Sequence, residues 1–375
     1  MPAPTILLIP GPVTTDPRVR APAARDYAPW DNDFREIFAR VRRRVVAVAG
    51  GTEGVHACMP LPGSGHFAIE AACRSFVPPG GRILLPLTGQ YADRMQRLAT
   101  EAGRVIVPMP VPDNTRVDPA EVQRLLEADP TISHVACVYS ETATGIIHDV
   151  PEIARAAGRA GRRVIVDAVS ALGALPFPLA GLPAVDAVIF TSNKCIEGLP
   201  GISFTVSPIE RLLACTGNAH SWSFDLPALY AHALQAGWGS HRFTPPAGVI
   251  AAFDAALDLF DAEGGQPARL ARYMANARVL YEGVQKLGLS PMLPQELQGP
   301  IVMNIAAPPD PQWDLQRFVD GLKARGIVIS NFYNTKEPGM RIGCIGAIGP
   351  NDMLRAVTAM GDVLSEMRIQ HRHAA

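Results

Sequence analysis

Residues 163–194 read RVIVDAVSALGALPFPLAGLPAVDAVIFTSNK. They contain two short runs, 163–168 and 186–191, in which apolar residues follow one another instead of alternating with polar ones. Such runs are typical of strands in a parallel sheet that helices cover on both faces. Asp167 lies at the end of the first run and Lys194 just after the second. We therefore expect an α/β fold with both ionisable side chains at the carboxyl edge of its sheet.

The same alternation of strand-like and helix-like segments extends along the preceding chain. Apolar runs and helical patterns succeed one another at 82–87, 104–109, 118–128, 134–139 and 150–161. Residues 201–207 (GISFTVS) predict one further strand, which must run antiparallel because the connection to its predecessor is too short for a crossover.

After about residue 260 the pattern changes to a smaller α+β unit. It contains a helix at 266–287, the apolar segment GPIVMNIAA, a helix beginning near Asp310–Pro311, strands at 327–330 and 340–345, and a last helix from near Asn351. We expect three parts: an N-terminal arm (1–20), a large domain (21–262) and a small C-terminal domain (263–375).

The composition excludes several function classes. The 375 residues are 48% hydrophobic and 18% charged, with a net charge of −1, which gives no footprint for nucleic acid. The basic run Arg40–Arg44 is typical of the solvated face of a helix. No apolar run could span a bilayer, and no basic leader precedes an apolar core. Six cysteines without a CxxC pair indicate reduced thiols and a cytoplasmic protein, and nine histidines show no metal spacing.

A glycine-rich turn at 62–72 (PGSGHFAIEAA) opens a helix and predicts an anion-binding cup of backbone N–H groups. Gly63, Gly65 and Ala68 also match the dinucleotide pattern GxGxxG/A. That pattern requires a strand before it and an acidic residue about 20 positions later. The preceding ACMPLP is broken by prolines and 82–92 contains no acid, so a phosphate is favoured over a dinucleotide.

Each remaining polar residue has an ordinary interpretation when taken alone. Asp167 could cap the next helix, Lys194 could reach solvent along its own carbons, and Tyr91 could simply be packed. Ser140 and Thr142 in SETATG could belong to a plain turn. Together, however, a phosphate cup, an aromatic ring, a carboxylate, hydroxyls and a lysine at one sheet edge are what pyridoxal phosphate requires.

The chain resembles the fold-type I, class V pyridoxal-phosphate aminotransferases, and within them the 2-aminoethylphosphonate–pyruvate aminotransferases. The resemblance rests on LIPGPVTT (8–15), PWDNDF (29–34), GSGHFAIEA (63–71), SETATG (140–145), VDAVSALG (166–173), SNKCIEGLPG (192–201), HRFTPP (241–246) and MRIGCIG (340–346). It implies a mainly parallel seven-stranded sheet flanked by helices, a smaller C-terminal α+β domain, and bound pyridoxal 5′-phosphate.

The resemblance also implies a role for each matching residue. Lys194 would form the Schiff base with the cofactor and Asp167 would pair with the pyridine nitrogen. The rest of the cofactor site would comprise the phosphate-binding Ser64, Gly65 and His66, the ring-stacking Tyr91, Thr142 near the 3′-oxygen, Asn193, and Thr244 acting on the other subunit of a homodimer. Arg341 would bind the anionic end of the substrate, with Trp30 and Arg242 as further candidates.

The implied reaction is transfer of the amine of 2-aminoethylphosphonate to pyruvate, as in phosphonate catabolism. Two departures leave an alanine– or serine–glyoxylate type of class V enzyme open: the cup reads GSGH, and Ala143 replaces a frequent hydroxyl. A nicotinamide-dependent oxidoreductase and a non-catalytic binding protein that keeps the fold also stay open. A cysteine desulfurase is disfavoured because Cys344 lies in a strand-like segment instead of a loop.

Overall fold

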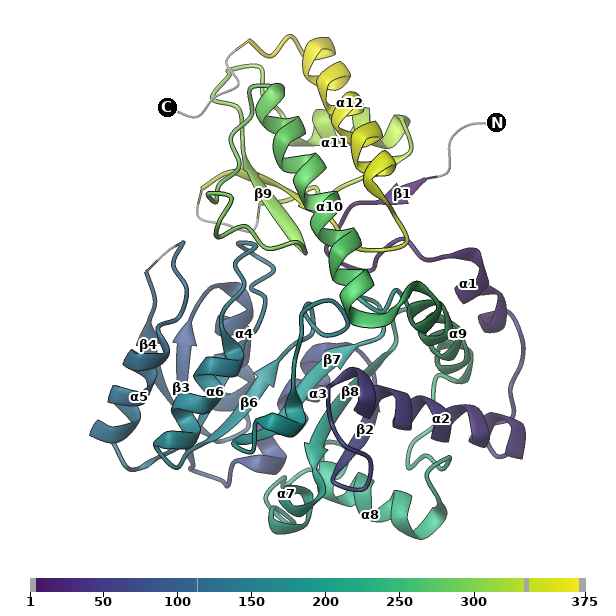
Figure 1. Cartoon of the computed structure of the whole chain (residues 1–375), viewed down its shortest axis with the longest axis vertical. Coiled ribbons are helices and arrows are strands. Elements are labelled where there is room, and N and C mark those ends of the chain that lie inside the picture. The colour runs from purple at the N-terminus through teal and green to yellow at the C-terminus, as the bar shows by residue number, and fades with distance from the viewer. Residues whose placement is uncertain (1–4, 113, 334–336, 371–375) are drawn as a thin grey trace.

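A seven-stranded sheet forms the centre of the larger part of the computed structural model, which describes residues 5–112, 114–333 and 337–370 (Figure 1). In spatial order the strands are β2 (His56–Pro62), β8 (Ile202–Pro208), β7 (Val185–Thr191), β6 (Arg163–Asp167), β5 (Ile132–Val138), β3 (Arg82–Leu87) and β4 (Val105–Pro110). The five strands from β7 to β4 are parallel, and β8 is antiparallel to both of its neighbours. The predicted fold class and the antiparallel strand at 201–207 are confirmed.

Helices cover both faces of this sheet, as the continuous apolar strands predicted. One face packs against α2 (Asn32–Val48), α5 (Pro119–Ala128), α6 (Val150–Arg159) and α9 (Ala247–Glu263), and the other against α3 (Gly65–Phe76), α4 (Gln90–Glu101), α7 (Ile209–Ala214) and α8 (Leu226–Ala236). Because side chains alternate along a strand, Val164 and Val166 enter the first core whereas Ile165 enters the second.

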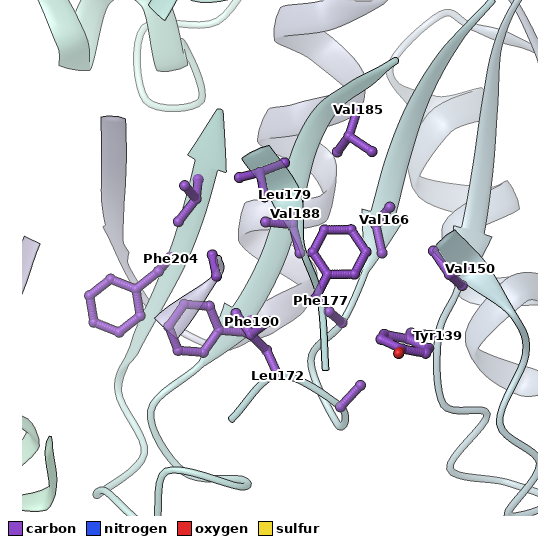
Figure 2. Packing of buried hydrophobic residues seen from close by; sticks show 14 of the residues in the cluster. Tyr139, Val150, Val166, Leu172, Phe177, Leu179, Val185, Val188, Phe190 and Phe204 are labelled. Carbon is purple, nitrogen blue, oxygen red and sulfur yellow. The ribbon is translucent and has the colours of Figure 1, made fainter. Parts of the chain in front are cut away.

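Aromatic stacking fills the first core beneath the end of β7. Phe190 and Phe204 lie with ring centroids 5.1 Å apart, and Phe253 from α9 stacks 4.9 Å from Phe204. Figure 2 shows Phe190 and Phe204 projecting side by side from neighbouring strands, with Phe177 nearby. This dense packing fixes the strand that leads to Lys194.

The segment preceding the glycine-rich turn corrects one expectation. Its prolines led us to expect no strand there, yet residues 56–62 form β2, with Pro60 paired to Phe204. Strand β2 is at the edge of the sheet, and proline is tolerated there because one side of an edge strand needs no donor. Because this strand exists, the prolines before the turn were not a valid reason to disfavour dinucleotide binding.

The basic run at 40–44 is also different from the expected solvated face. Arg42 is buried and donates to the Cys58 carbonyl (3.1 Å) and the Trp238 carbonyl (3.0 Å), and burial lowers its pKa to about 10. Arg40 and Arg44 both bind the carboxylate of Asp254 on α9. The expected solvated face therefore holds for Arg40 and Arg43, which are exposed, and is wrong for the buried Arg42.

The C-terminal part contains α10 (Gly265–Lys286), β9 (Val302–Ala306), α11 (Leu315–Ala324), β10 (Ile327–Val328), β11 (Gly339–Gly343) and α12 (Pro350–Glu366). Strands β9 and β11 pair antiparallel, and the helices cover them through a separate apolar core. Helix α11 starts later than the expected Asp310–Pro311, because Asp314 caps it by accepting from the Arg317 N–H (2.8 Å).

The N-terminal segment joins this C-terminal part. Strand β1 (Ile6–Leu7) pairs parallel with β10, and the Gly343 N–H donates to the Leu8 carbonyl (2.8 Å). A short helix, α1 (Pro17–Ala23), then packs against α9. The chain between these contacts passes over Lys194, whose side chain donates to the Pro10 carbonyl (2.5 Å).

We propose the same division into an arm (1–20), a large domain (21–262) and a small domain (263–375) that the sequence suggested. The described residues support it because α9 and α10 meet at Gly264 and the apolar core of the C-terminal part is separate from those of the sheet. Among the described residues, no helix has the length and apolar character needed to cross a membrane.

Candidate active site

Lys194 lies in a tight turn directly after β7. The turn is closed by the Glu197 N–H donating to the Lys194 carbonyl (2.9 Å) and the Gly198 N–H donating to the Ser192 carbonyl (2.8 Å). The Lys194 ammonium donates to the Pro10 carbonyl (2.5 Å). A Cβ at Gly11, whose φ is 141°, would lie 2.7 Å from the Nζ atom of Lys194, so a side chain there would displace the end of the lysine. The N-terminal arm therefore covers the lysine.

The environment of Lys194 favours its neutral, nucleophilic form. Burial lowers its pKa to about 8, and the nearby cations Arg341 and Arg94 act in the same direction. Asp167 opposes them, so the lysine and the aspartate share one electrostatic environment. A primary amine that loses its proton near neutral pH can attack a carbonyl carbon.

Asp167 ends β6 and is buried. Burial raises the pKa of its carboxyl to about 6, although the Val169 N–H, which donates to Oδ1 (2.9 Å), and the charge of Lys194 lower it. A carboxylate with so few partners in a buried site is completed by a ligand that brings a positive or hydrogen-bonding group.

The predicted anion cup lies at the amino end of α3. Ser64 is the N-cap residue, and its hydroxyl lies 2.8 Å from Nδ1 of His66. The next residue, Gly65, has no room for a side chain, because a Cβ there would lie 2.5 Å from the Val169 side chain. Burial, and then the charge of Arg94, lower the pKa of His66. The cup and Asp167 are therefore linked through residue 169.

SETATG supplies a buried wall on the other side of Asp167. Thr142 Oγ1 lies 2.8 Å from the hydroxyl of Ser170, and the hydroxyl of Ser140 is buried without a hydrogen-bond partner among the described residues. Glu141 is fully buried and accepts from the Ala143 N–H (3.1 Å). Burial raises the pKa of Glu141 to about 7.

Arg341 reaches this wall from β11 in the C-terminal part. Its guanidinium donates to the Thr142 carbonyl (3.4 Å) and the Ser330 hydroxyl (3.5 Å) and lies 5.4 Å from the ring centroid of Phe332. Burial lowers its pKa, while the neighbouring Tyr91 hydroxyl raises it. The structure thus brings the predicted anion-binding arginine to the same site as Lys194.

Three predicted residues lie on a different surface. Thr244 is exposed, Arg242 lies 5.2 Å from the ring centroid of Trp222, and Trp30 is 73% exposed and packs 4.5 Å from the ring of His241. Within the described part of the chain, no hydrogen bond, ion pair or ring contact joins them to Lys194, Asp167 or Arg341. Their predicted roles stay predictions. Asn193, beside the lysine, accepts from the Thr191 hydroxyl (2.9 Å).

Comparison with known proteins decides the family. The family model for aminotransferase class-V matches residues 23–342, which is most of the chain. The chain belongs to the class V aminotransferases. The match covers the lysine, the aspartate, the glycine-rich cup and Arg341, so the cluster described above lies within the shared part of the family.

Curated relatives of this class V aminotransferase match over nearly its whole length. A 2-aminoethylphosphonate–pyruvate transaminase of Pseudomonas entomophila (strain L48) is 40% identical over 364 residues, covering 97% of this chain and 98% of the relative. A transaminase of the same name from Burkholderia lata is 40% identical over 365 residues, covering 97% and 96%.

Solved structures agree on the fold of this aminotransferase. Pyridoxamine-pyruvate aminotransferase from Mesorhizobium loti superposes with a TM-score of 0.87 at 25% identity, covering 98% of this chain and 93% of that one. An aspartate aminotransferase from Thermus thermophilus gives 0.84 at 26% identity, covering 96% and 99%. These neighbours confirm the fold-type I architecture.

Two residues that belong to this cluster escaped the sequence analysis. Arg94 lies one turn after Tyr91 on α4, 5.0 Å from its ring centroid, and its charge lowers the pKa values of His66, Asp167 and Lys194. The i, i+3 spacing from Tyr91 was a signal that could have identified it. Glu141 directly precedes Thr142 in SETATG, and nothing in its sequence position indicated complete burial.

Proposed function

We propose that this aminotransferase uses pyridoxal phosphate to move the amine of 2-aminoethylphosphonate to pyruvate. The proposal is carried by the 40% identity to two enzymes of that name over 97% of the chain. The donor carbon is oxidised by two electrons as it becomes the aldehyde phosphonoacetaldehyde. The carbonyl carbon of pyruvate is reduced by the same two electrons, and the product is alanine.

The residues present fit the cofactor. The amino end of α3, with Ser64, Gly65 and His66, offers backbone N–H groups to a phosphate. The incompletely paired carboxylate of Asp167 suits the protonated nitrogen of a pyridine ring, and Lys194 is the amine to which an aldehyde would bind. When bound, pyridoxal phosphate supplies an electron sink for breaking the Cα–H bond of the donor.

The protein's own groups would perform the remaining tasks. Lys194, with its pKa of about 8, can accept and return the proton at the donor carbon at near-neutral pH. The planar guanidinium of Arg341 would bind the phosphonate of the first substrate and the carboxylate of the second. The Thr142 carbonyl and the Tyr91 hydroxyl both contact this guanidinium, which limits how it can be oriented toward the donor.

The discriminating experiment follows each half-reaction separately. With 2-aminoethylphosphonate alone, we expect the visible absorbance of the bound cofactor to disappear while one equivalent of phosphonoacetaldehyde forms. Pyruvate should then restore the absorbance and yield alanine. Lys194→Ala should lose the visible band of the wild type and about 10⁴-fold of the turnover. A holoenzyme that reacts fully with alanine or serine but ignores 2-aminoethylphosphonate would refute this choice of donor.

An alanine– or serine–glyoxylate reaction is the second candidate, favoured by the GSGH cup and by Ala143. Ala143 has no hydroxyl; it is buried, and its carbonyl accepts from the Asn304 side chain. The same half-reaction with alanine or serine, followed by glyoxylate, separates the candidates. The donor with the higher kcat/KM is the substrate class of this enzyme.

A desulfurase reaction lacks support from the cysteines. All six cysteines are buried and unpaired, as the sequence predicted, and Cys344 is completely inaccessible. Burial raises the pKa of Cys344 to about 12, whereas a reactive thiol needs a low pKa and access to substrate. We also propose a cytoplasmic location on the basis of these reduced thiols.

We further propose a homodimer in which Thr244 reaches the cofactor phosphate of the partner. The proposal is supported by the exposure of two large aromatic side chains near this residue, Trp30 (73%) and Trp222 (71%). A mixture of Lys194→Ala and Thr244→Glu chains should regain activity that neither has alone, because one site of each mixed dimer is intact. No gain after unfolding and refolding together would contradict a shared site.

A further inference from the structure

Helix α10 carries an unusual polar face into the junction between the two parts of the molecule. It runs from the C-terminal part down to the large sheet (Figure 1). Four of its residues form what we call the α10 clamp: Arg269, Arg272, Tyr273 and Asn276. Arg269, Tyr273 and Asn276 are each at most 1% exposed. Burying so many polar groups is unfavourable unless each has a partner, so their partners define the role of this face.

On one side the clamp binds the turn that holds Lys194. The Tyr273 hydroxyl donates to Glu197 Oε1 (2.5 Å), and Arg272 donates to the same oxygen (2.8 Å). The carbonyl of Cys195, the residue after the lysine, accepts from Arg269 and lies 3.3 Å from the Tyr273 hydroxyl.

Glu197 itself has an unusual backbone conformation. Its φ of 63° is in the left-handed region, which residues with a side chain seldom adopt. Its carboxylate is held by three residues of the clamp: Tyr273 and Arg272 through hydrogen bonds, and Arg269 through an ion pair (3.4 Å). The clamp therefore stabilises the conformation of the turn that contains Lys194, because a shorter side chain at residue 197 would lose these bonds and a neutral one would lose the charge that strengthens them.

On its other side the clamp binds the segment that follows Arg341. Arg272 donates to the carbonyls of Gly346 (2.6 Å) and Ile348 (2.8 Å), and Asn276 donates to the carbonyl of Cys344 (3.0 Å). The Gly346 N–H donates to the Tyr273 hydroxyl (3.2 Å). Tyr273 and Arg272 thus touch the chain three residues after Lys194 and the chain shortly after Arg341.

The charges of the clamp are balanced within the cluster. Glu263, at the end of α9, accepts from Nε of Arg269 and from Nε of Arg272, each at 2.7 Å. With Glu197 there are two carboxylates for two guanidinium groups. These arginines lower the pKa of Glu263 despite its burial, so its ion pairs with Arg269 and Arg272 persist through the neutral range. The clamp is thereby also tied to the end of α9.

We propose that Tyr273 and Arg272 are positioning residues that fix the separation of Lys194 and Arg341, and thereby the length of the amine donor. The proposal rests on the proposed function, in which the donor's nitrogen meets the lysine end of the site and its anion meets Arg341. A linear donor spans both ends only if its carbon chain matches their separation. A misplacement of about 1 Å can reduce turnover about a hundredfold, so small movements should change selectivity.

The test compares donors that differ by one methylene group. Holoenzymes carrying Tyr273→Phe or Glu197→Gln, both nearly isosteric, are assayed with 2-aminoethylphosphonate and 3-aminopropylphosphonate. We expect the ratio of the two kcat/KM values to fall about tenfold in each variant. Arg278→Ala is the matched control: it lies on the same helix, is exposed, and makes no hydrogen bond or ion pair with the described residues, so its ratio should equal that of the wild type.

A second measurement needs no substrate. The pH midpoint of the visible absorbance of the bound cofactor reports the environment of residue 194, and it should shift in Tyr273→Phe and Glu197→Gln but not in Arg278→Ala. An unchanged donor ratio together with an unchanged midpoint, whether or not thermal stability falls, would overturn the proposal. If the wild type ignores 2-aminoethylphosphonate, the proposed function fails, while the absorbance midpoint still decides whether the clamp positions the lysine.

Discussion

Two buried aspartates on neighbouring strands differ in the number of their partners. Asp186, near the start of β7, accepts from Nε of Arg163 (2.6 Å), Nε of Arg211 (2.9 Å) and Nε2 of His134 (3.3 Å). Asp167, at the opposite end of β6, accepts from one backbone N–H (2.9 Å). Neither is more than 3% exposed.

Their pKa values follow this difference. Burial alone would raise the pKa of Asp186, yet His134 and the arginines bring it below its usual value. For Asp167, burial prevails and its pKa rises to about 6. A buried carboxylate with a full set of partners stabilises the fold, whereas one with an incomplete set is available to a ligand. Burial and residue type are the same in both, so the partners identify the functional one.

Between the two aspartates, the larger effect on turnover should come from Asp167→Asn. An amide is isosteric but cannot keep a pyridine nitrogen protonated, so we expect kcat to fall by about 10³-fold while the protein stays folded. Turnover and the unfolding temperature of the same preparation measure the two effects. Full activity in this variant would show that Asp167 takes no part in the chemistry. The inference that the aspartate with few partners is the functional one would then be wrong.

Asp186→Asn should show the opposite pattern. It leaves Arg163 and Arg211 without a buried counter-charge, so the free energy of unfolding should decrease by about 3 kcal/mol, as for other broken buried ion pairs. Urea unfolding measures this loss, and activity per folded molecule at low temperature should be near that of the wild type. If Asp186→Asn lost activity and kept its stability, the assignment of a purely structural role would be wrong.

The pH dependence of stability sharpens the comparison. Because the folded-state pKa of Asp167 (about 6) exceeds its ordinary value of 3.8, the folded protein binds the proton more tightly between these pH values. The contribution of Asp167 to stability therefore decreases as pH rises through this window. We compare the free energies of unfolding of Asp167→Asn and of the wild type, both without cofactor. The difference, variant minus wild type, should increase by about 2 kcal/mol from pH 4.5 to pH 7.

Urea unfolding of both proteins at the two pH values gives this difference directly. Asp186→Asn is the internal reference. Its stability relative to the wild type should change with pH in the opposite direction, because the folded-state pKa of Asp186 is lowered. Its ionised form stabilises the native state above its ordinary pKa, and that stabilisation is lost as pH falls. Equal pH slopes for the two variants would show that partner number does not govern these carboxylates.

The smallest effect concerns Arg94, which lowers the pKa values of both Asp167 and Lys194. Arg94→Gln should therefore raise both. Fewer lysines would be neutral at a given pH, so the pH profile for cofactor capture by the cofactor-free protein should move upward. Arg97→Gln is the control, since Arg97 is on the same helix, exposed, and paired with Glu101 (2.8 Å). Identical profiles for the two variants would exclude Arg94 from the site.

Much of the fold could be predicted because short stretches of sequence determine its strands and helices. Apolar runs on both faces predict a covered parallel sheet, and polar residues that end such runs, Asp167 and Lys194, lie at its edge. The prolines of β2 hid a strand because their tolerance depends on its edge position, which is a property of the whole sheet. Arg42 was misread for a similar reason: one of its acceptors, the Trp238 carbonyl, is 196 residues away.

The candidate site was predictable where a single motif holds a whole feature, as in the cup at Ser64–His66 and in SETATG. It was not predictable where a side chain acts across elements. The proximity of Arg94 to the lysine and the complete burial of Glu141 depend on how α4 and SETATG pack against the sheet. The partners of Tyr273 likewise come from two separate segments, the turn at 195–197 and the chain at Gly346.

The pairing of Ile6 with Ile327 has a consequence for biosynthesis. The strand that holds the N-terminal arm in place, β10, is translated only after all strands of the large sheet. Until then, Pro10 and Gly11 have no anchor from which to cover the amine of residue 194. The arm is thus translated long before the strand that anchors it, and the reactive pocket closes late in maturation.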